Sequence, residues 1–347
     1  MKLMNKVGPG DPKLKEQFEK LEQTRAHIPD SINSTFQVGP FAIRLASASS
    51  ALHGKISKAF NHLRQTDSHS LANLTICLWD TSESKENLPP LDWKLIHQNG
   101  YQGYSKPPFY FHYFDAIQAL SVLNMEQNKA HFIVQDTQKL PWWVSGSPLQ
   151  VILHIWFRNH GMHLTHTAAI SNGQTGLLLT GKGGSGKSTT VLACLTQGLF
   201  YVGEDYCLLA GGDPPTAYSI YQSAKWRPYT RELYPGYDAW IANPKSADSE
   251  KALIYYQEIF PSQIKCSSSI HAIISLHVGQ QKKPVLKQHS LIHSLKDLMM
   301  STLLQLPFPH PSTMTILQKF ASQTEHFHLT LGQDLDANAA LLKGLMK

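Results

Sequence analysis

One segment, "GLLLTGKGGSGKSTTVLACLTQ" at positions 176–197, constrains the fold more than any other part of this chain. Its first five residues predict a short buried strand, and "KSTTVLACLTQ" predicts an amphipathic helix with Val191, Leu192 and Leu195 on its inner face. The glycine-rich loop between them fits the pattern G-x-x-x-x-G-K-[ST] of phosphate-binding loops. A strand, such a loop and a helix in this order predict an α/β fold that binds a nucleotide.

The composition of the loop explains how it would hold phosphate. Its four glycines allow backbone N–H groups to approach phosphate oxygens, and the helix N-terminus adds a partial positive charge. We expect Lys187 to bridge the β- and γ-phosphates and the Ser188 hydroxyl to bind Mg²⁺, so ATP and Mg²⁺ are the predicted ligands. The predicted nucleotide-binding residues are Gly181, Lys182, Gly183, Gly184, Ser185, Gly186, Lys187, Ser188 and Thr189.

Two adjacent acids follow the loop helix. In "FYVGEDYC", Glu204 and Asp205 come at the end of an apolar segment that predicts a strand. Phosphoryl transfer requires a carboxylate near the phosphate, either to hold metal or to accept a proton from the attacking hydroxyl. We therefore expect this pair at the site, with Glu204 joining Ser188 as a metal ligand.

The spacing of these residues resembles the HPr kinase family, particularly its smaller relatives encoded beside peptide-modification genes. Gly198 ends the predicted loop helix, and Asp205 lies 18 positions after Lys187. His166, in "THTAAI", lies 15 positions before Gly181, which matches the interval to a functional histidine of that family. The resemblance implies that Asp205 is the base and that His166 acts beside the phosphate. The predicted catalytic residues are Asp205, Lys187, His166 and Glu204.

The resemblance continues downstream and covers roughly residues 160 to 340. "YSIYQSAKW" and "SEKALIYYQEIFP" look like two segments of the peptide-modifying relatives, which makes Lys225 and Lys251 candidates for phosphate or substrate contacts. The chain has Glu204 where HPr kinases have an aspartate, and it lacks clear counterparts of a later glutamate and a later arginine. These departures argue against HPr itself as the substrate.

The implied organisation has two domains. Residues 1–145 predict a smaller mixed α/β region that recognises a substrate or partner, with strands at "FAIRLAS", "LTICLW", "FYFHYF" and "AHFIVQD". An apolar helix in "SPLQVILHIWFRNHG" connects it to the catalytic domain, residues 146–347. The resemblance implies that this domain has the phosphoenolpyruvate-carboxykinase-like fold of HPr kinases, a mixed sheet with flanking helices around the phosphate-binding loop.

The expected function is a kinase that transfers the γ-phosphate of ATP to a hydroxyl, most simply a serine of a peptide or protein. A small-molecule kinase of the same fold is one alternative. Another is a dimeric partitioning-type ATPase, in which Lys182 would reach the nucleotide of a partner and Asp213 would imitate a switch aspartate. The extra 180 residues before the loop and the turn "GGDPP" oppose that alternative.

Charge and composition exclude other classes. The net charge of +6 is scattered, which argues against nucleic acid as a partner, and the apolar runs are too short for a membrane span. Four widely separated cysteines predict neither a disulfide framework nor a zinc ribbon, so we expect a cytoplasmic enzyme without a signal peptide. His163 and His166 would point to opposite faces of a strand, which disfavours a metal site there. The sequence is compatible with a homo-oligomer and does not define its size.

Overall fold

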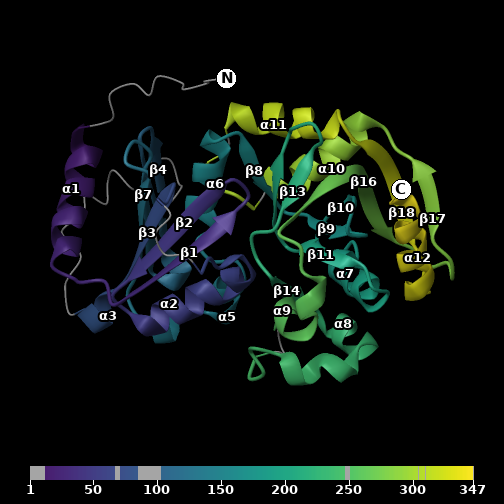
Figure 1. Ribbon diagram of the computed structural model, residues 1–347, viewed down its shortest axis with the longest axis horizontal. Helices are drawn as coiled ribbons and strands as arrows, with labels where there is room; N and C mark the ends of the chain where they lie inside the picture. Colours follow the sequence, from purple (N-terminus) through teal and green to yellow (C-terminus); the bar gives the residue numbers. More distant parts are fainter. Residues whose placement is uncertain are drawn as a thin grey trace. The chain divides into compact units, whose positions relative to one another are not determined.

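A computed structural model describes residues 12–66, 71–84, 103–246, 251–303, 305–308 and 310–346 (Figure 1). The chain divides into two compact units, Met1–Trp156 (unit 1) and Phe157–Lys347 (unit 2). The division falls within the apolar helix α6 (Gln150–Asn159), the segment that was predicted to connect the domains. Both units contain mixed sheets with flanking helices, which confirms the expected α/β fold class. None of the helices in the described ranges is long and apolar enough to cross a membrane.

Unit 1 contains a seven-stranded mixed sheet in the order β1-β2-β3-β7-β6-β5-β4. The pairs β2–β3 and β3–β7 are parallel, and the other neighbours are antiparallel. The strands are β1 (Ile32–Val38), β2 (Phe41–Ser47), β3 (Leu74–Asp80), β4 (Gly103–Lys106), β5 (Phe109–Phe114), β6 (Ala119–Asn124) and β7 (Lys129–Val134). The α-helices are α1 (Pro12–Ala26), α2 (Ser50–Ser57), α3 (Thr81–Ser84), α5 (Trp142–Gly146) and the start of α6.

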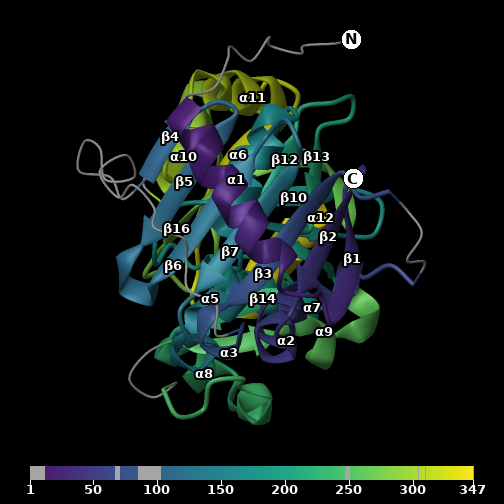
Figure 2. The same cartoon turned by 90° about the vertical axis from the view of Figure 1, so that its left-hand side faces the viewer.

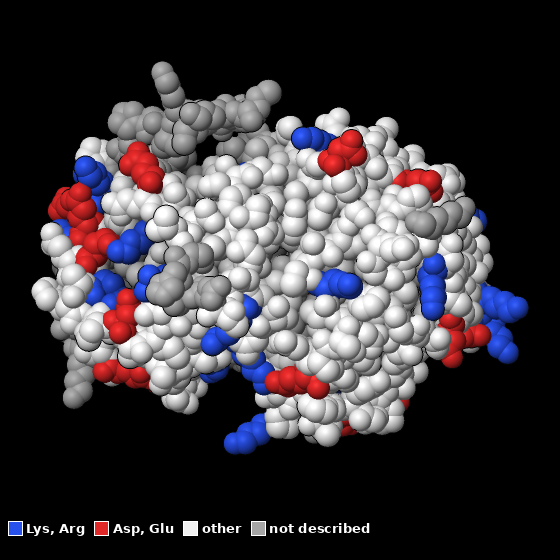
Figure 3. Space-filling model, viewed as in Figure 1, with Lys and Arg blue, Asp and Glu red and all other residues white. Residues whose placement is uncertain are grey.

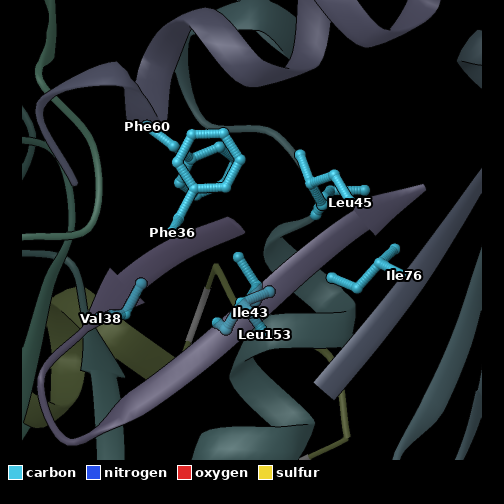
Figure 4. Close-up of a pocket in the computed structure, with 8 residues that line it drawn as sticks. Phe36, Val38, Ile43, Leu45, Phe60, Ile76 and Leu153 are labelled. Carbon is cyan, nitrogen blue, oxygen red and sulfur yellow. The ribbon is translucent and has the colours of Figure 1, made fainter. Parts of the chain in front are cut away.

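Helix α1 packs on one face of this sheet, as the view in Figure 2 shows. The spacing of Leu14, Phe18 and Leu21 places all three on one side of the helix, and they are buried against Trp79 and Phe111. A second apolar cluster surrounds a small cavity in the same unit (Figure 4). Its lining residues are Phe36, Val38, Ile43, Leu45, Phe60, Ile76, Leu149 and Leu153. Because these side chains are all apolar, the cavity is a space in the core packing and offers a ligand no polar side chain.

Unit 2 contains a nine-stranded mixed sheet in the order β11-β9-β10-β16-β13-β12-β8, with β18 paired to β16 and β17 to β18. Its central pair, β10–β16, is parallel. The sheet strands are β8 (Met162–Thr165), β9 (Ala168–Ser171), β10 (Gly176–Thr180), β11 (Phe200–Gly203), β12 (Cys207–Ala210), β13 (Thr216–Tyr218), β16 (Ser267–Val278), β17 (Val285–Gln288) and β18 (Glu325–Leu331). A separate two-stranded sheet pairs β14 (Ser223–Trp226) with β15 (Ala252–Tyr255).

Helices cover both faces of the larger sheet of unit 2. The α-helices are α7 (Lys187–Thr196), α8 (Pro228–Leu233), α9 (Tyr256–Ile259), α10 (Leu291–Leu303), α11 (Pro311–Ala321) and α12 (Leu335–Leu345). Alternate residues of β10 enter different cores: Leu177 and Leu179 pack with α7 and α12, and Leu178 packs with α10 and α11. This alternation follows from the two-residue period of a strand, and it explains why β10 is apolar throughout.

Two strand-forming segments that carry predicted site residues are bent. "LTHTAAI" forms β8 and β9 with a break at His166 and Thr167, and "LFYVGEDYCLLA" forms β11 and β12 with a break at 204–206. The two breaks lie side by side, because Thr165 pairs with Cys207 on one side of them and Ala169 pairs with Gly203 on the other. The predicted site residues His166, Glu204 and Asp205 lie in these breaks.

Candidate functional site

The glycine-rich loop lies where the sequence predicted, between the end of β10 and the start of α7. Gly181 and Gly186 have φ angles of 145° and 93°, which a side chain at Cβ disfavours. A Cβ on Gly181 would lie 2.6 Å from Ser185 Oγ, and one on Gly186 would lie 2.6 Å from Leu331 Cδ1. The loop therefore needs glycine for both backbone conformation and space, and it ends at the N-terminus of α7, whose first N–H groups lack partners within the helix.

Lys187 is buried at the inner side of this loop. Its Nζ donates a hydrogen bond to the Gly181 carbonyl oxygen at 2.6 Å, which holds the amine inside the curve of the loop. Burial lowers the pKa of Lys187 to about 8, against the opposing effect of the nearby carboxylates Asp205 and Glu204. Lys251 also lowers this pKa, so its charge acts on the loop although its side chain is exposed.

The paired bends bring His166 and Asp205 together. His166 Nε2 lies 3.4 Å from Asp205 Oδ1, and Lys225 Nζ donates to Asp205 Oδ2 at 2.7 Å. Asp205 has φ 64°, in the left-handed region, where non-glycine residues are uncommon and often functional. Burial opposes ionisation of Asp205, but Lys225 and His166 outweigh it and hold the pKa of this carboxyl well below its usual range.

Glu204 has the opposite electrostatic environment, although it is adjacent in sequence. Its side chain is buried, the Tyr256 hydroxyl donates to its Oε2 at 2.9 Å, and the Ser188 hydroxyl also hydrogen-bonds it. Burial raises the pKa of Glu204 to about 7, and the charge of Asp205 adds to that rise. The site thus contains one carboxylate that stays ionised and a neighbour that titrates near neutral pH.

Each of the predicted residues can now be placed. The hydrogen bonds, ion pairs and charge interactions described above join six of them: Lys187, Ser188, Glu204, Asp205, His166 and Lys225. Lys182 is exposed on the loop. Thr189 shares a hydrogen bond between hydroxyls with Thr230 of α8, at 2.9 Å. His163 is buried away from His166, where it contacts the Leu164 carbonyl oxygen and the Thr313 hydroxyl.

Four further residues at the site were not singled out from the sequence. Tyr256 is the residue at which strand β15 ends and helix α9 begins. Gln305 contacts His166 Nδ1 through Nε2 at 3.1 Å, and it accepts a hydrogen bond from the Tyr206 hydroxyl at 2.8 Å. Arg227 lies over Gly184 of the loop. Only Arg227 carried a sequence signal, since a second basic residue follows two positions after Lys225.

The Gln305 contact bears on the tautomer of His166. With the amide nitrogen on Nδ1, a neutral imidazole would carry its proton on Nε2, which faces Asp205. The Tyr206 hydroxyl hydrogen-bonds the oxygen of the same amide. His166 can therefore donate a hydrogen bond toward the carboxylate while its other nitrogen is held in place.

No family model and no curated protein matches the sequence. Among solved structures, the chain is similar to the "Structure of the Hpr(Ser) kinase/phosphatase from Coxiella burnetii", at 12% sequence identity and a TM-score of 0.31. That match covers 52% of this chain and 94% of the other.

Proposed function

We propose that the protein is an ATP-dependent kinase that transfers the γ-phosphate of ATP to a hydroxyl, namely a serine of a peptide or protein. One observation carries the proposal: paired strand bends hold Asp205, with His166 and Lys225, beside a phosphate-binding loop. A loop that only binds nucleotide has no need of an ionised carboxylate held by two cationic or hydrogen-bonding groups. A phosphotransferase needs such a group for its acceptor.

On the phosphate side, Lys187 and the loop would stabilise negative charge. Backbone N–H groups of the loop and the first turn of α7 would donate to phosphate oxygens. Lys187 would exchange its bond to the Gly181 carbonyl for bonds to the β- and γ-phosphates. A charged amine preorganised in a buried position stabilises the transition state more than a solvated one.

The donor atoms near the loop fit Mg²⁺. The Ser188 hydroxyl and the Glu204 carboxylate hydrogen-bond each other, and both are the hard oxygen ligands that this ion prefers. Bound there, Mg²⁺ would neutralise charge on the phosphates. Tyr256 would keep the Glu204 carboxylate oriented by donating to Oε2.

On the acceptor side, Asp205 would orient the hydroxyl and take its proton. The depressed pKa makes Asp205 a weak base but leaves it ionised throughout the physiological pH range. Proton transfer to it becomes favourable once the new O–P bond has formed, since the acceptor oxygen is then more acidic. His166, with its proton on Nε2, and Lys225 would hold the carboxylate in position meanwhile.

The choice of a serine acceptor comes from the resemblance to the HPr kinase relatives, and unit 1 would recognise the peptide or protein. A small-molecule kinase would use the same groups, so the acceptor must be identified by assay. The exposed position of Lys182 favours a second candidate, the partitioning-type ATPase, because such a lysine must reach a partner. That mechanism gives no role to the contacts of Asp205 with His166 and Lys225.

The test is transfer of label from γ-labelled ATP to a serine-peptide library by the full-length protein with Mg²⁺. We expect transfer by the wild type, and we expect Asp205→Asn to reduce turnover by about 100-fold or more while ATP affinity stays near normal. Nucleotide binding without transfer of labelled phosphate to any peptide or hydroxyl-bearing metabolite would refute the kinase proposal.

Asp213→Asn is the matched control. Asp213 is exposed in unit 2 and lies outside the proposed mechanism, but it would be the switch residue of a partitioning ATPase. We expect unchanged transfer from this variant. Loss of ATP hydrolysis in Asp213→Asn and in Lys182→Ala, with none in Asp205→Asn, would favour the ATPase instead.

A further inference from the structure

Arg227 occupies a defined place between a strand and a helix. It follows β14 and precedes Pro228, the first residue of α8, with φ −75° and ψ 161°. Because this backbone is extended, side chains continue to alternate, so Arg227 emerges on the side of Lys225 while Trp226 between them is buried. Lys225 reaches Asp205 from that side, so the backbone directs both cationic side chains toward the site.

The guanidinium of Arg227 lies across the loop at Gly184. Its Nη1 and Cζ atoms lie 3.6 Å and 4.0 Å from the position that a Cβ at Gly184 would take. Gly184 has φ 87°, so glycine both permits the loop conformation and leaves this space to the arginine. Lys187 contacts the same loop at the Gly181 carbonyl, so the two cations contact it at different residues.

No carboxylate neutralises Arg227 within the described part of the chain. Its side chain is exposed and has no hydrogen-bond or ion-pair partner among those residues. Arg231, one turn further along α8, instead pairs with Asp238 at 3.3 Å. An arginine that lies against a glycine-rich loop, with no anion beside it among the described residues, is suited to an anionic ligand, since its planar guanidinium fork matches phosphate oxygens.

The segment that carries Arg227 is fixed to the loop helix. The Thr230 hydroxyl in α8 and the Thr189 hydroxyl in α7 hydrogen-bond at 2.9 Å. On the other side, the Trp226 indole donates to the Tyr256 hydroxyl at 3.0 Å. Because the chain is anchored on both sides of Arg227, the fold sets the position of its backbone relative to the loop.

We propose that Arg227 binds the phosphates of the nucleotide, as a second cation that acts from the outer side of the loop opposite Lys187. The proposal rests on the proposed function only in taking a nucleoside triphosphate as the ligand. It assigns the residue to binding and leaves proton transfer to Asp205. Lysine at this position would keep the charge but lose the fork, so it would restore binding only in part.

The experiment measures binding of a fluorescent, non-hydrolysable ATP analogue with Mg²⁺ to four full-length proteins: wild type, Arg227→Ala, Arg227→Lys and Arg231→Ala. We expect Arg227→Ala to weaken binding by roughly tenfold or more, because a hydrogen-bonded charged contact is lost. Arg227→Lys should be intermediate, and Arg231→Ala, the matched arginine of α8, should bind like the wild type. Thermal unfolding of each variant shows whether the fold is kept.

The outcomes separate this inference from the proposed function. Equal binding by Arg227→Ala and the wild type would overturn the role of Arg227 and leave the kinase proposal standing. A second outcome is weakened binding by Arg227→Ala but not by Arg231→Ala, together with no phosphate transfer by the wild-type protein. That result would support phosphate binding by Arg227 and refute the kinase proposal. If Arg227→Ala unfolds, the lysine variant decides: wild-type affinity in Arg227→Lys would show that the fork is not used.

Discussion

At the residue scale, two adjacent carboxyl groups differ in their chemistry because they face different surroundings. Glu204 is enclosed with Tyr256 and Ser188, and its pKa rises to about 7 chiefly because of burial. Asp205 faces Lys225 and His166, which keep it ionised. Pairs of titratable groups whose pKa values are pushed apart in this way are typical of sites that divide two roles between them. The division proposed above gives metal binding to Glu204 and the acceptor hydroxyl to Asp205.

Tyr256 provides a residue-scale prediction about stability. Its hydroxyl donates to Glu204 and accepts from the Trp226 indole, and all three side chains are buried. We expect Tyr256→Phe to lower the free energy of unfolding by about 1–3 kcal/mol, because both partners lose a buried hydrogen bond. Urea unfolding checks this value. The control Tyr229→Phe, at a side chain that is 64% exposed in α8, should leave stability unchanged. Equal stability of both variants would contradict the prediction.

At the scale of the element, glycine is required at the start of helix α7 but not inside helix α12. Gly186 caps α7 with φ 93° and faces Leu331 of β18, whereas a Cβ added to Gly344, inside α12, would meet no atom within 4 Å. Gly186 has a positive φ angle that only glycine adopts easily, whereas Gly344 is not among the glycines with a positive φ angle. The same substitution should therefore have opposite effects at the two sites.

We expect Gly186→Ala to destabilise the protein by about 1–2 kcal/mol, since alanine is strained in the left-handed region. We expect Gly344→Ala to stabilise it by roughly 0.5–1 kcal/mol, because alanine is the better residue inside a helix. Thermal or denaturant unfolding of the two variants measures the difference. A neutral Gly186→Ala would show that the loop conformation is not maintained by that residue.

At the scale of the whole molecule, charge is dispersed and each unit has its own core. On the face shown in Figure 3, basic and acidic side chains are interspersed and form no continuous stripe of one sign. Unit 1 has a partly buried ionic cluster of its own, in which Glu22 of α1 contacts Lys129 and His131 of β7. Burial opposes ionisation of Glu22, but these two partners outweigh it and lower its pKa to about 2.

This cluster predicts that acid weakens the attachment of α1. The folded-state pKa of Glu22 lies below the ordinary value of 4.5, so its contribution to stability is present above that pH and is lost as pH falls toward about 2. Burial also lowers the pKa of His131, which acts in the same direction below its ordinary value of 6.5. We expect Glu22→Gln to lower the melting temperature at pH 7 and to have a smaller effect at pH 3.

Melting curves of the wild type and Glu22→Gln across this pH range provide the test. Glu19→Gln is the control, because Glu19 lies on the same helix and makes only a solvent-exposed pair with Lys15. Its effect should be small at every pH. A Glu22→Gln effect that stays constant from pH 7 to pH 3 would contradict the role of the cluster.

The sequence by itself determined the parts of this protein that depend on local pattern. The buried strand at 176–180, the loop and the helix that begins at Lys187 were predicted nearly to their bounds, because glycine and apolar periodicity are local signals. The acids at 204 and 205 were also expected near the loop. Lys225 was proposed from a resemblance alone, and its ion pair with Asp205 came only from the structure.

Tertiary structure alone decided how these residues meet. The bends at 166–167 and 204–206 interrupt sequences with strand propensity, and they lie where two segments distant in sequence pair with each other, β8 with β12 and β9 with β11. Gln305 reaches the site from a distant segment through folding, so no spacing in the sequence reveals it. Local pattern therefore identifies the glycine-rich loop between a strand and a helix, whereas long-range strand pairing brings together the side chains proposed to act beside it.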